Sequence, residues 1–455
     1  MSICAISSIG FDVSQSITRG FVIGAPMSGS GKTIVTLGLL RFFKKDGLSI
    51  KGIKIGPDYI DPSYHARATE KPCNNLDLWA MRDNTVKQLL RESRKKSDLI
   101  IFEGVMGLFD GALTAQGTNT GSTADVAKAL NLPIVLVVDA KGQGASVSAL
   151  VQGFKQFRDD IVLAGVVFNR VSSINHERIL RQSLSQIDVI CFGCIPNDES
   201  LALDHRHLGL IQASEIQDID DWLDNAAQTV SKNIDIKLLE LKMGVVPDLD
   251  KTEAAAPLPA LGRHIAIARD NAFNFFYDHI LDGWRKNGTK ISFFSPLADE
   301  ALPVGVDSVY LPGGYPELFA ETLSTNCNFM TSMRSAAKDG ASIYGECGGF
   351  MVLGEELIDQ NGFSHRMLGL LPVKTSFEHP KLNLGYRLLT LVENSFLGAT
   401  GDKFTAHEFH YSNAINDDKL FPLFKNSDAR GEDLTNIGCK VANVAGSFAH
   451  IIDSV

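Results

Sequence analysis

Hydrophobic residues recur along the first half of the chain as short continuous runs, separated by longer segments of mixed polarity. The runs are GFVIGA (20–25), IKGIKIG (50–56), DLIIFEG (98–104), LPIVLVVDA (132–140), LAGVVFNRV (163–171) and DVICFGCIP (188–196). They are rich in Val and Ile and apolar on both faces, which is typical of parallel strands covered by helices. Segments with helical periodicity lie between them, such as 33–45 and 121–131. This alternation predicts a doubly wound, mostly parallel α/β sheet.

A second series of apolar runs follows an irregular stretch. Residues 244–262 mix Pro, Ala and charged residues without periodicity, as expected of a linker. Strand-like runs then recur at 264–270, 290–296, 306–314, 341–346, 385–394 and 444–452. We therefore predict an N-terminal extension (1–19), an α/β domain (20–243), a linker (244–262) and a second α/β domain (263–455).

Composition narrows the class of protein. A chain of 455 residues is long enough for two or three domains. Its net charge is -10 and no basic run is present, which argues against a nucleic-acid surface. No apolar stretch approaches the roughly 20 residues that span a bilayer, so no membrane partner is expected. Seven scattered cysteines favour a reducing, cytoplasmic setting, with Cys191 and Cys194 as buried thiols rather than a redox or metal pair.

The segment FVIGAPMSGSGKT ends an apolar run and opens a helical one. Its glycines let backbone N–H groups approach phosphates, its lysine can reach the outer phosphate oxygens, and its threonine can bind Mg²⁺. The pattern G-x-x-x-x-G-K-[ST] departs at Pro26, where glycine is usual, but the lysine and threonine favour a nucleotide site over a plain glycine-rich turn. The predicted nucleotide-binding residues are Ser28, Gly29, Ser30, Gly31, Lys32 and Thr33.

Carboxylates follow the next two apolar runs. GPDYIDP places Asp58 and Asp61 after the second run, and EGVMGLFDG places Glu103 and Asp110 after the third. Because the carboxyl ends of parallel strands meet at one edge of a sheet, we expect all four beside Lys32, where oxygen ligands suit Mg²⁺. The aspartates are equally typical of turns, whereas Glu103 ends a wholly apolar run.

A lone cysteine marks the second domain. In ASIYGECGGFM, Cys347 follows a strand-like run, lies between glycines and precedes a helix, which is the arrangement of a nucleophile at a sharp strand-to-helix turn. We expect the helix N-terminus to lower the pKa of the Cys347 thiol. Backbone N–H groups of Gly313 and Gly314, in YLPGGYPE, are candidates for an oxyanion hole. A thiol nucleophile also needs a base, usually histidine. The candidates are His407 and His410 in AHEFHYS and His450 in GSFAH, and spacing alone does not choose among them.

Seven segments in this order closely resemble the cobyrinic or hydrogenobyrinic acid a,c-diamide synthases of cobalamin biosynthesis. They are SGSGKT, GPDYIDP, EGVMGLFDG, LPGGYPE, YGECGGFM, HEFHYS and GSFAH. The phosphate loop is shared with the wider dethiobiotin-synthetase-like group, whereas the second and third segments together are more specific. The resemblance implies an N-terminal ATP-dependent amide-forming domain and a C-terminal class I glutamine amidotransferase domain.

The resemblance also implies a reaction. Cys347 would attack the side-chain amide of glutamine, release ammonia and form a thioester that water then hydrolyses. The first domain would use ATP to phosphorylate an acetate side chain of a corrinoid, since a carboxylate is a poor acyl donor, and ammonia would displace the phosphate. Two rounds would convert the a and c acetates. Glutamine and a corrinoid are thus the expected partners, ATP and Mg²⁺ the expected cofactors, and a homodimer the expected assembly.

Residue roles carried over from the family are as follows. His450 would be the base for Cys347, with His407 and His410 near the substrate or the domain interface. Thr33, Asp58 and Glu103 would bind the metal, and Tyr59, Asp61 and Asp110 would contact the substrate or intermediate. Asn169 and Arg170 would contact the adenine or the corrinoid. Many class I glutaminases carry a glutamate two residues after the histidine, where this chain has Ile452, so an orienting carboxylate is absent or comes from another segment.

Three other functions fit part of the pattern. One is cobyric acid synthase, which amidates the same ring later but usually lacks GPDYIDP. Another is amidation of a nickel-containing sirohydrochlorin. A third, from a different class, is a regulatory P-loop ATPase with an inactive glutaminase-like domain; the presence of both Cys347 and His450 argues against it.

Overall fold

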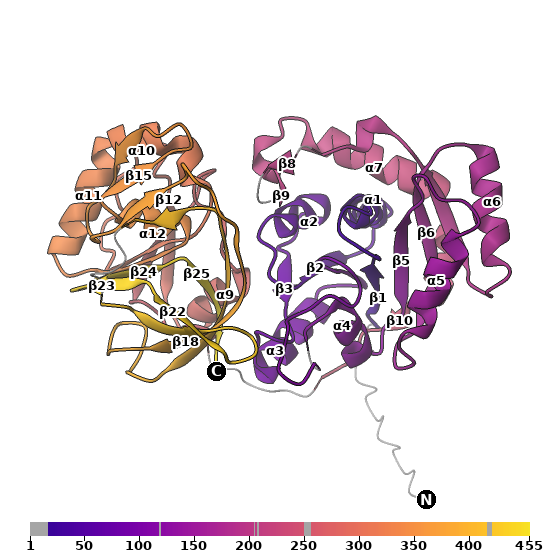
Figure 1. Cartoon of the computed structure of the whole chain (residues 1–455), viewed down its shortest axis with the longest axis horizontal. Helices are drawn as coiled ribbons and strands as arrows, with labels where there is room; N and C mark the ends of the chain where they lie inside the picture. The colour runs from indigo at the N-terminus through magenta and orange to yellow at the C-terminus, as the bar shows by residue number, and fades with distance from the viewer. Residues whose placement is uncertain (1–16, 118–119, 204, 207–208, 250–255, 416–420) are drawn as a thin grey trace, which may run out of the picture.

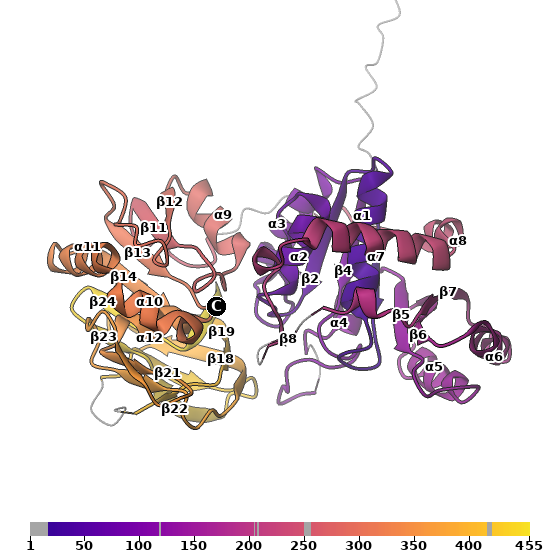
Figure 2. The same cartoon turned by 90° about the horizontal axis from the view of Figure 1, so that it is seen from above.

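The computed structural model describes residues 17–117, 120–203, 205–206, 209–249, 256–415 and 421–455. Two lobes lie side by side, the N-terminal one coloured indigo to magenta and the C-terminal one orange to yellow (Figures 1 and 2). Most of the predicted extension, residues 1–16, lies outside the described residues, as do residues 250–255 of the predicted linker.

The N-terminal lobe contains an eight-stranded sheet in the order β3-β2-β4-β1-β5-β6-β7, with the short β10 pairing antiparallel to β1. The strands are β1 (Arg19–Gly24), β2 (Ile50–Ile55), β3 (Asn74–Leu76), β4 (Leu99–Glu103), β5 (Ile134–Asp139), β6 (Leu163–Val171), β7 (Cys191–Pro196) and β10 (Gly244–Val245). The seven strands of the main path pair in parallel, and all six predicted runs are among them. The predicted α/β class is therefore confirmed.

Helices cover this sheet and complete the doubly wound arrangement (Figure 1). They are α1 (Lys32–Lys45), α2 (Asp61–Thr69), α3 (Asp83–Arg94), α4 (Thr123–Leu130), α5 (Val147–Gln156), α6 (Ile174–Leu184), α7 (Ile219–Asn233) and α8 (Ile236–Lys242), with a hairpin of β8 (His205–Arg206) and β9 (Gly209–Leu210). The carboxyl ends of β1, β2 and β4 open the loops that carry the predicted nucleotide and carboxylate residues.

The C-terminal lobe has its own six-stranded sheet, in the order β12-β11-β13-β14-β24-β23. Its strands are β11 (His264–Ala268), β12 (Lys290–Phe294), β13 (Ser308–Leu311), β14 (Ser342–Glu346), β23 (Cys439–Val441) and β24 (Val444–Ser447), and its helices are α9 (Asp278–Lys286), α10 (Ala320–Thr325), α11 (Cys327–Lys338) and α12 (Gly348–Leu353). The nucleophile candidate Cys347 lies between β14 and α12.

Two further sheets complete this lobe, one antiparallel and one mixed, and the sequence pattern did not predict their pairing. One has the order β22-β21-β18-β19-β25, from β18 (Asn383–Leu391), β19 (Lys403–His410), β21 (Phe424–Ser427), β22 (Asp433–Ile437) and β25 (Ala449–Ser454). The other contains β15 (Glu356–Ile358), β16 (Ser364–Arg366), β17 (Lys374–Ser376) and β20 (Asn413–Ala414).

The apolar run at 444–452 is two strands rather than the one that we predicted. It pairs with β14 up to Ser447 and, as β25, with β19 from Ala449 onwards. The run is buried in both sheets, so its hydrophobicity gives no sign of the break at Phe448. The crossing brings His450 close to the end of β14.

The two lobes share a continuous interface. One cluster of buried hydrophobic side chains extends from Phe21 and Phe102 in the N-terminal lobe to Tyr277, Leu389 and Ile451 in the C-terminal lobe. The main polar contact joins Arg82 to the fully buried Asp453, with Nη2 to Oδ1 at 2.7 Å and the Arg82 backbone N–H to Oδ2 at 2.8 Å. Contacts of this kind fix the orientation of one lobe against the other.

Candidate active site

The phosphate-loop candidate connects β1 to α1. Gly29 has φ 75° and Gly31 has φ 97°, a left-handed conformation that favours glycine. A Cβ on Gly31 would also lie 2.0 Å from the Asn169 amide nitrogen. Lys32 then starts α1, so the loop presents the helix N-terminus as a phosphate-binding loop requires.

Two residues at the end of β6 hold this loop. The Asn169 side-chain amide donates to the Ser30 carbonyl at 3.1 Å, and Arg170 donates to the Gly29 carbonyl at 3.0 Å. Arg170 also forms an ion pair with Asp139 at the end of β5. In this structure, Asn169 and Arg170 therefore support the backbone of the loop.

Lys32 lies across the loop, with its Nζ 3.5 Å from the Met27 carbonyl and 2.5 Å from the Met106 carbonyl. Burial and the nearby Lys54 ammonium lower the pKa of Lys32 to about 8. Met106 adopts a positive φ of 54°, which turns its carbonyl toward Lys32. Together, the loops after β1 and β4 enclose the lysine.

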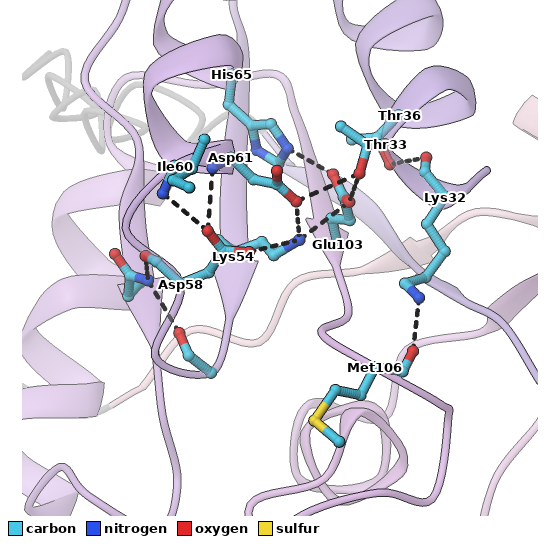
Figure 3. Close-up of polar contacts among 12 residues, drawn as sticks. Lys32, Thr33, Thr36, Lys54, Asp58, Ile60, Asp61, His65, Glu103 and Met106 are labelled. Atoms are coloured by element: carbon cyan, nitrogen blue, oxygen red, sulfur yellow. Dashed lines mark hydrogen bonds and ion pairs between the residues drawn. The ribbon is translucent and has the colours of Figure 1, made fainter. Parts of the chain in front are cut away.

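Carboxylates from α2 and β4 gather around a second lysine (Figure 3). Lys54 Nζ forms ion pairs with Asp61, with Glu103 Oε1 at 3.0 Å and with Asp58 Oδ2 at 3.5 Å. Thr33 Oγ1 donates to Glu103 Oε1 at 2.8 Å and lies 3.3 Å from Asp61 Oδ2. Thr33 of the phosphate loop thus meets the carboxylate motifs, but the lysine that forms ion pairs with Asp58, Asp61 and Glu103 is Lys54 rather than the predicted Lys32.

Sequence reasoning missed Lys54 and its neighbour His65. Strand register places Lys54 directly beside Glu103, and His65 Nε2 lies 2.6 Å from Glu103 Oε2. A signal was present, because a lysine inside the apolar run IKGIKIG is unusual unless it is paired. Burial alone would raise the pKa of Glu103, but the Lys54 charge and the bonds from His65 and Thr33 lower it.

The aspartates have different surroundings. Burial and the neighbouring Asp58 raise the pKa of Asp61, against the opposing charge of Lys54. Asp58 Oδ1 accepts the backbone N–H groups of Ile60 and Asp61, and Asp110 Oδ2 accepts that of Gly107. Asp58 and Asp110 therefore do shape turns, yet both also line the cavity between the lobes.

The oxygen donors fit a magnesium ion that keeps most of its ligands from water and phosphate. Within the described part of the chain, no three His, Cys, Asp or Glu side chains are placed to hold a metal by themselves. The Thr33 hydroxyl does lie within hydrogen-bond distance of the carboxylates of both Glu103 and Asp61. Asp61 is the aspartate that lies beside Thr33, whereas Asp58, the aspartate that we predicted as a metal ligand, lies beside Lys54, and its role as a ligand stays a prediction.

A cavity of about 840 Å³ lies between the lobes. Ser28, Asp58, Asp61 and Asp110 line it from the N-terminal lobe, and Tyr386, Arg387, His407 and Phe409 from the C-terminal lobe. Tyr59 also lines it. Because both lobes contribute residues, a ligand in this cavity would contact the carboxylate cluster and the C-terminal lobe together.

Cys347 occupies a strained turn in the C-terminal lobe. Its φ of 47° and ψ of -106° are unusual for a residue with a side chain, and its backbone N–H donates to the Ser447 carbonyl at 2.8 Å. A Cβ on Gly349, two residues after Cys347, would lie 2.0 Å from the Leu311 carbonyl oxygen, which explains why glycine is needed there. This is the geometry predicted from the sequence.

The electrostatic prediction for Cys347 is wrong for this structure. Burial raises the pKa of the thiol, although the backbone N–H groups of Gly348 and Gly314 lower it in part. α12 has six residues, and its N-terminus does not offset the loss of solvent. The backbone N–H of Gly314, one of the two predicted oxyanion donors, thus points to the sulfur, and so does that of Gly348, which sequence reasoning missed.

The geometry separates the three candidate histidines. His410 Nδ1 lies 3.0 Å from the Ser412 carbonyl oxygen and its Nε2 lies 2.8 Å from Glu408 Oε1, so both ring nitrogens have acceptor partners of their own. His407 faces the interdomain cavity. His450 and Cys347 both pack against Gly313. A Cβ added to that glycine would lie 2.2 Å from the His450 ring and 3.1 Å from the Cβ of Cys347, so these two side chains are neighbours. Burial lowers the pKa of His450 to about 3, so its imidazole is neutral.

Tyr59 connects the two candidate centres. It comes from the GPDYIDP segment, and its ring lies 4.4 Å from the His450 ring, centroid to centroid. The Tyr59 hydroxyl is 2.9 Å from the Tyr277 hydroxyl and 3.5 Å from His407 Nδ1. One aromatic side chain therefore lies between the His450 ring and the interdomain cavity.

Comparisons with known proteins agree with this geometry. Residues 21–210 match the CobQ/CobB/MinD/ParA nucleotide binding domain, and residues 264–454 match the CobB/CobQ-like glutamine amidotransferase domain. Fold and site together define a glutamine-dependent carbon–nitrogen ligase, with a nucleotide-binding lobe and an amidotransferase lobe in one chain.

Relatives identify the family. Proteins named hydrogenobyrinate a,c-diamide synthase are 47% identical in Brucella anthropi and 48% identical in Rhizobium meliloti, each over 96% of this chain and at least 98% of their own length. The Agrobacterium fabrum protein of that name is 42% identical over 95% of the chain. The chain therefore belongs to the hydrogenobyrinate a,c-diamide synthase family. Across the described residues, no helix is long and apolar enough to cross a bilayer.

Proposed function

We propose that this protein transfers nitrogen from glutamine to the a and c acetate side chains of hydrogenobyrinate, with ATP as the energy source, in cobalamin biosynthesis. The observation that carries the proposal is that only the ring of Tyr59 separates the Cys347–His450 pair from the cavity that Asp58, Asp61 and Asp110 line. The names of the relatives favour the metal-free corrinoid over cobyrinate and other tetrapyrroles.

In the C-terminal lobe, neutral His450 accepts the thiol proton of Cys347 while the sulfur bonds to the amide carbon of glutamine. The N–H groups of Gly314 and Gly348 are suited to stabilise the resulting oxyanion. The carbon–nitrogen bond then breaks, and ammonia leaves with the proton from His450. Water hydrolyses the thioester, which releases glutamate and restores the thiol.

In the N-terminal lobe, the acetate oxygen attacks the γ-phosphorus of ATP and the bond to the β-phosphate oxygen breaks. Ammonia then attacks the carbonyl carbon of this acyl phosphate, and phosphate leaves with the surplus proton. Lys32 and the loop N–H groups bind the phosphates. Thr33, Glu103 and Asp61 would hold Mg²⁺, which reduces the charge on the transferred phosphoryl group when it is bound.

We propose that amidation takes place in the interdomain cavity, which is lined by residues of both lobes. Asp58, Tyr59 and Asp110 would contact the corrinoid there, as would His407 and Arg387 of the C-terminal lobe. The free thiols of the described cysteines are compatible with the reducing cytoplasm that we propose as the setting. A homodimer belongs to the same proposal.

Two variants test the division of labour between the lobes. Cys347→Ser should lose glutamine-dependent amidation and retain amidation with free ammonia, because the nucleotide lobe is intact. Lys32→Ala should lose amidation from both nitrogen sources and retain glutamine hydrolysis. Mass spectrometry of the corrinoid products and a glutamate assay measure both activities. Glutamine hydrolysis at the wild-type rate by Cys347→Ser would contradict the proposal.

A further inference from the structure

A buried carboxylate lies behind the proposed base, although the residue two positions after His450, where many class I glutaminases carry a glutamate, is Ile452. Glu346, the residue directly before Cys347, has its Oε2 3.8 Å from His450 Nδ1, and both side chains are 1% exposed. No function considered so far uses Glu346. A carboxyl group at this depth requires an explanation, because burying an ionisable side chain is costly.

The backbone around Glu346 fixes the position of its carboxylate. Its Oε1 accepts the backbone N–H of Ile451 at 3.1 Å, and its Oε2 accepts the hydroxyl of Tyr310 at 2.6 Å. Ile451 is the residue after His450, and Glu346 pairs with Ser447 across β14 and β24. The carboxylate is therefore attached to the same turn of chain that carries the histidine.

His450 is close to both Cys347 and this carboxylate. A Cβ added to Gly313 would lie 2.2 Å from Cε1 and 2.9 Å from Nε2 of His450, and 3.1 Å from the Cβ of Cys347. The opposite ring nitrogen, Nδ1, faces Glu346. Among the described residues, neither ring nitrogen of His450 has a hydrogen-bond partner, so the contact with Glu346 is available to Nδ1.

We propose that Glu346 is a positioning residue for glutamine hydrolysis, which accepts the Nδ1–H of His450 and so directs the Nε2 lone pair toward the Cys347 thiol. This inference rests on the proposed role of Cys347. A shift of about 1 Å would convert the present separation into a hydrogen bond, and catalytic contacts often tighten when substrate binds. When His450 receives the thiol proton, the carboxylate stabilises the imidazolium that forms.

Protonation of Glu346 makes the proposal measurable. Burial raises the pKa of Glu346 to about 7, and the hydrogen bonds from Tyr310 and Ile451 lower it in part. The carboxylate is thus ionised only above roughly neutral pH. The other titratable groups that face the Glu346–His450 pair are Tyr59, Tyr277, Tyr344, Cys347, His407, Glu408 and His410.

The test compares two variants with opposite expected shifts in the pH profile of kcat/KM for glutamine hydrolysis. Glu346→Gln keeps the side-chain volume but removes the charge, so the acidic limb near neutral pH should move to lower pH while kcat falls by about 10²-fold. Tyr310→Phe removes a donor that lowers the pKa of Glu346, so the acidic limb should move to higher pH. A merely structural role predicts no shift in either variant.

Ammonia-dependent amidation should be unchanged in both variants, which checks that they are folded. An unmoved acidic limb with kcat within threefold of wild type in Glu346→Gln would overturn the positioning role. If Cys347→Ser still hydrolyses glutamine, the proposed function fails first. If Cys347→Ser is inactive and Glu346→Gln is not impaired, only the inference about Glu346 fails.

Discussion

Single residues in this protein owe their properties to partners that lie far away in the sequence. Lys54 is 2% exposed, and its charge survives because Asp61, Glu103 and Asp58 surround it. Burial would lower the pKa of its ammonium, but these three carboxylates raise it. Glu103, fully buried at the end of β4, depends on Lys54 in turn.

Lys54→Met should therefore destabilise the protein by about 3–5 kcal/mol, because it leaves buried carboxylates without their partner. The pKa of Asp61 and Glu103 would rise in the variant, so its stability falls as pH increases through these raised values. The gap to wild type in thermal unfolding, measured without Mg²⁺, should widen from mildly acidic to mildly basic pH.

Lys51→Met is the matched control on the same strand, since the Lys51 ammonium donates to the neutral Asn74 side chain at 2.7 Å. It should show a smaller loss and a weaker pH dependence. Equal, pH-independent losses in both variants would show that Lys54 does not neutralise the cluster.

Site residues could be predicted where the signal lies in neighbouring residues of the sequence. Cys347 and Lys32 belong to short segments whose glycines indicate the local backbone conformation. Lys54 and Glu346 escaped notice because each lies within a strand, and its partner comes from another element. Sequence spacing did not decide which of three histidines is the base for Cys347. His450 is distinguished only by the three-dimensional structure, in which the chain passes from β24 into β25 and β25 pairs with β19.

At the scale of elements, the connections after parallel strands build the site. The α/β order was predictable because each parallel strand is apolar on both faces and alternates with a helix. The antiparallel pairing of β18, β19 and β25 was not predictable, because these strands come from distant segments of the chain and β18 has mixed burial. That sheet supplies His407 and His450.

The two loop glycines allow a sharp test at this scale. Gly31→Ala should be more damaging than Gly29→Ala, because an added Cβ at Gly31 clashes with Asn169, while nothing lies within 4 Å of one at Gly29. In both variants the alanine would have a positive φ, which costs about 1–3 kcal/mol of backbone strain. Isothermal titration with ATP and thermal unfolding measure the difference.

Gly29→Ala should still bind ATP with moderately reduced affinity, whereas Gly31→Ala should bind it far more weakly. Equal binding by the two variants would show that contact between the loop and β6 does not shape the phosphate site.

At the scale of the whole molecule, the interface fixes the distance between the two active centres. Asp453 is fully buried and receives three hydrogen bonds from Arg82, at 2.7, 2.8 and 3.0 Å. Tyr386 in β18 donates to Asp77 of the N-terminal lobe at 2.7 Å. Both contacts join the two lobes, so loosening them should separate the lobes.

Arg82→Ala should reduce stability by about 3–5 kcal/mol, since it leaves Asp453 buried without a cation. It should also release ammonia into solution, so that less amide forms for each glutamine hydrolysed. Arg67→Ala is the control, because Arg67 forms an exposed ion pair with Asp220 and its loss costs about 1 kcal/mol or less. A wild-type ratio of amide to glutamate in Arg82→Ala would contradict the importance of this contact.

The most direct measurement of the central claim follows the nitrogen itself. The protein is incubated with ATP, Mg²⁺, hydrogenobyrinate and glutamine labelled at its side-chain amide nitrogen, in the presence of unlabelled ammonium. Our account predicts that wild type places the label in both product amides, and that Cys347→Ser makes the diamide from unlabelled ammonium alone. Labelled diamide from Cys347→Ser, or no ATP-dependent amidation by wild type, would contradict it.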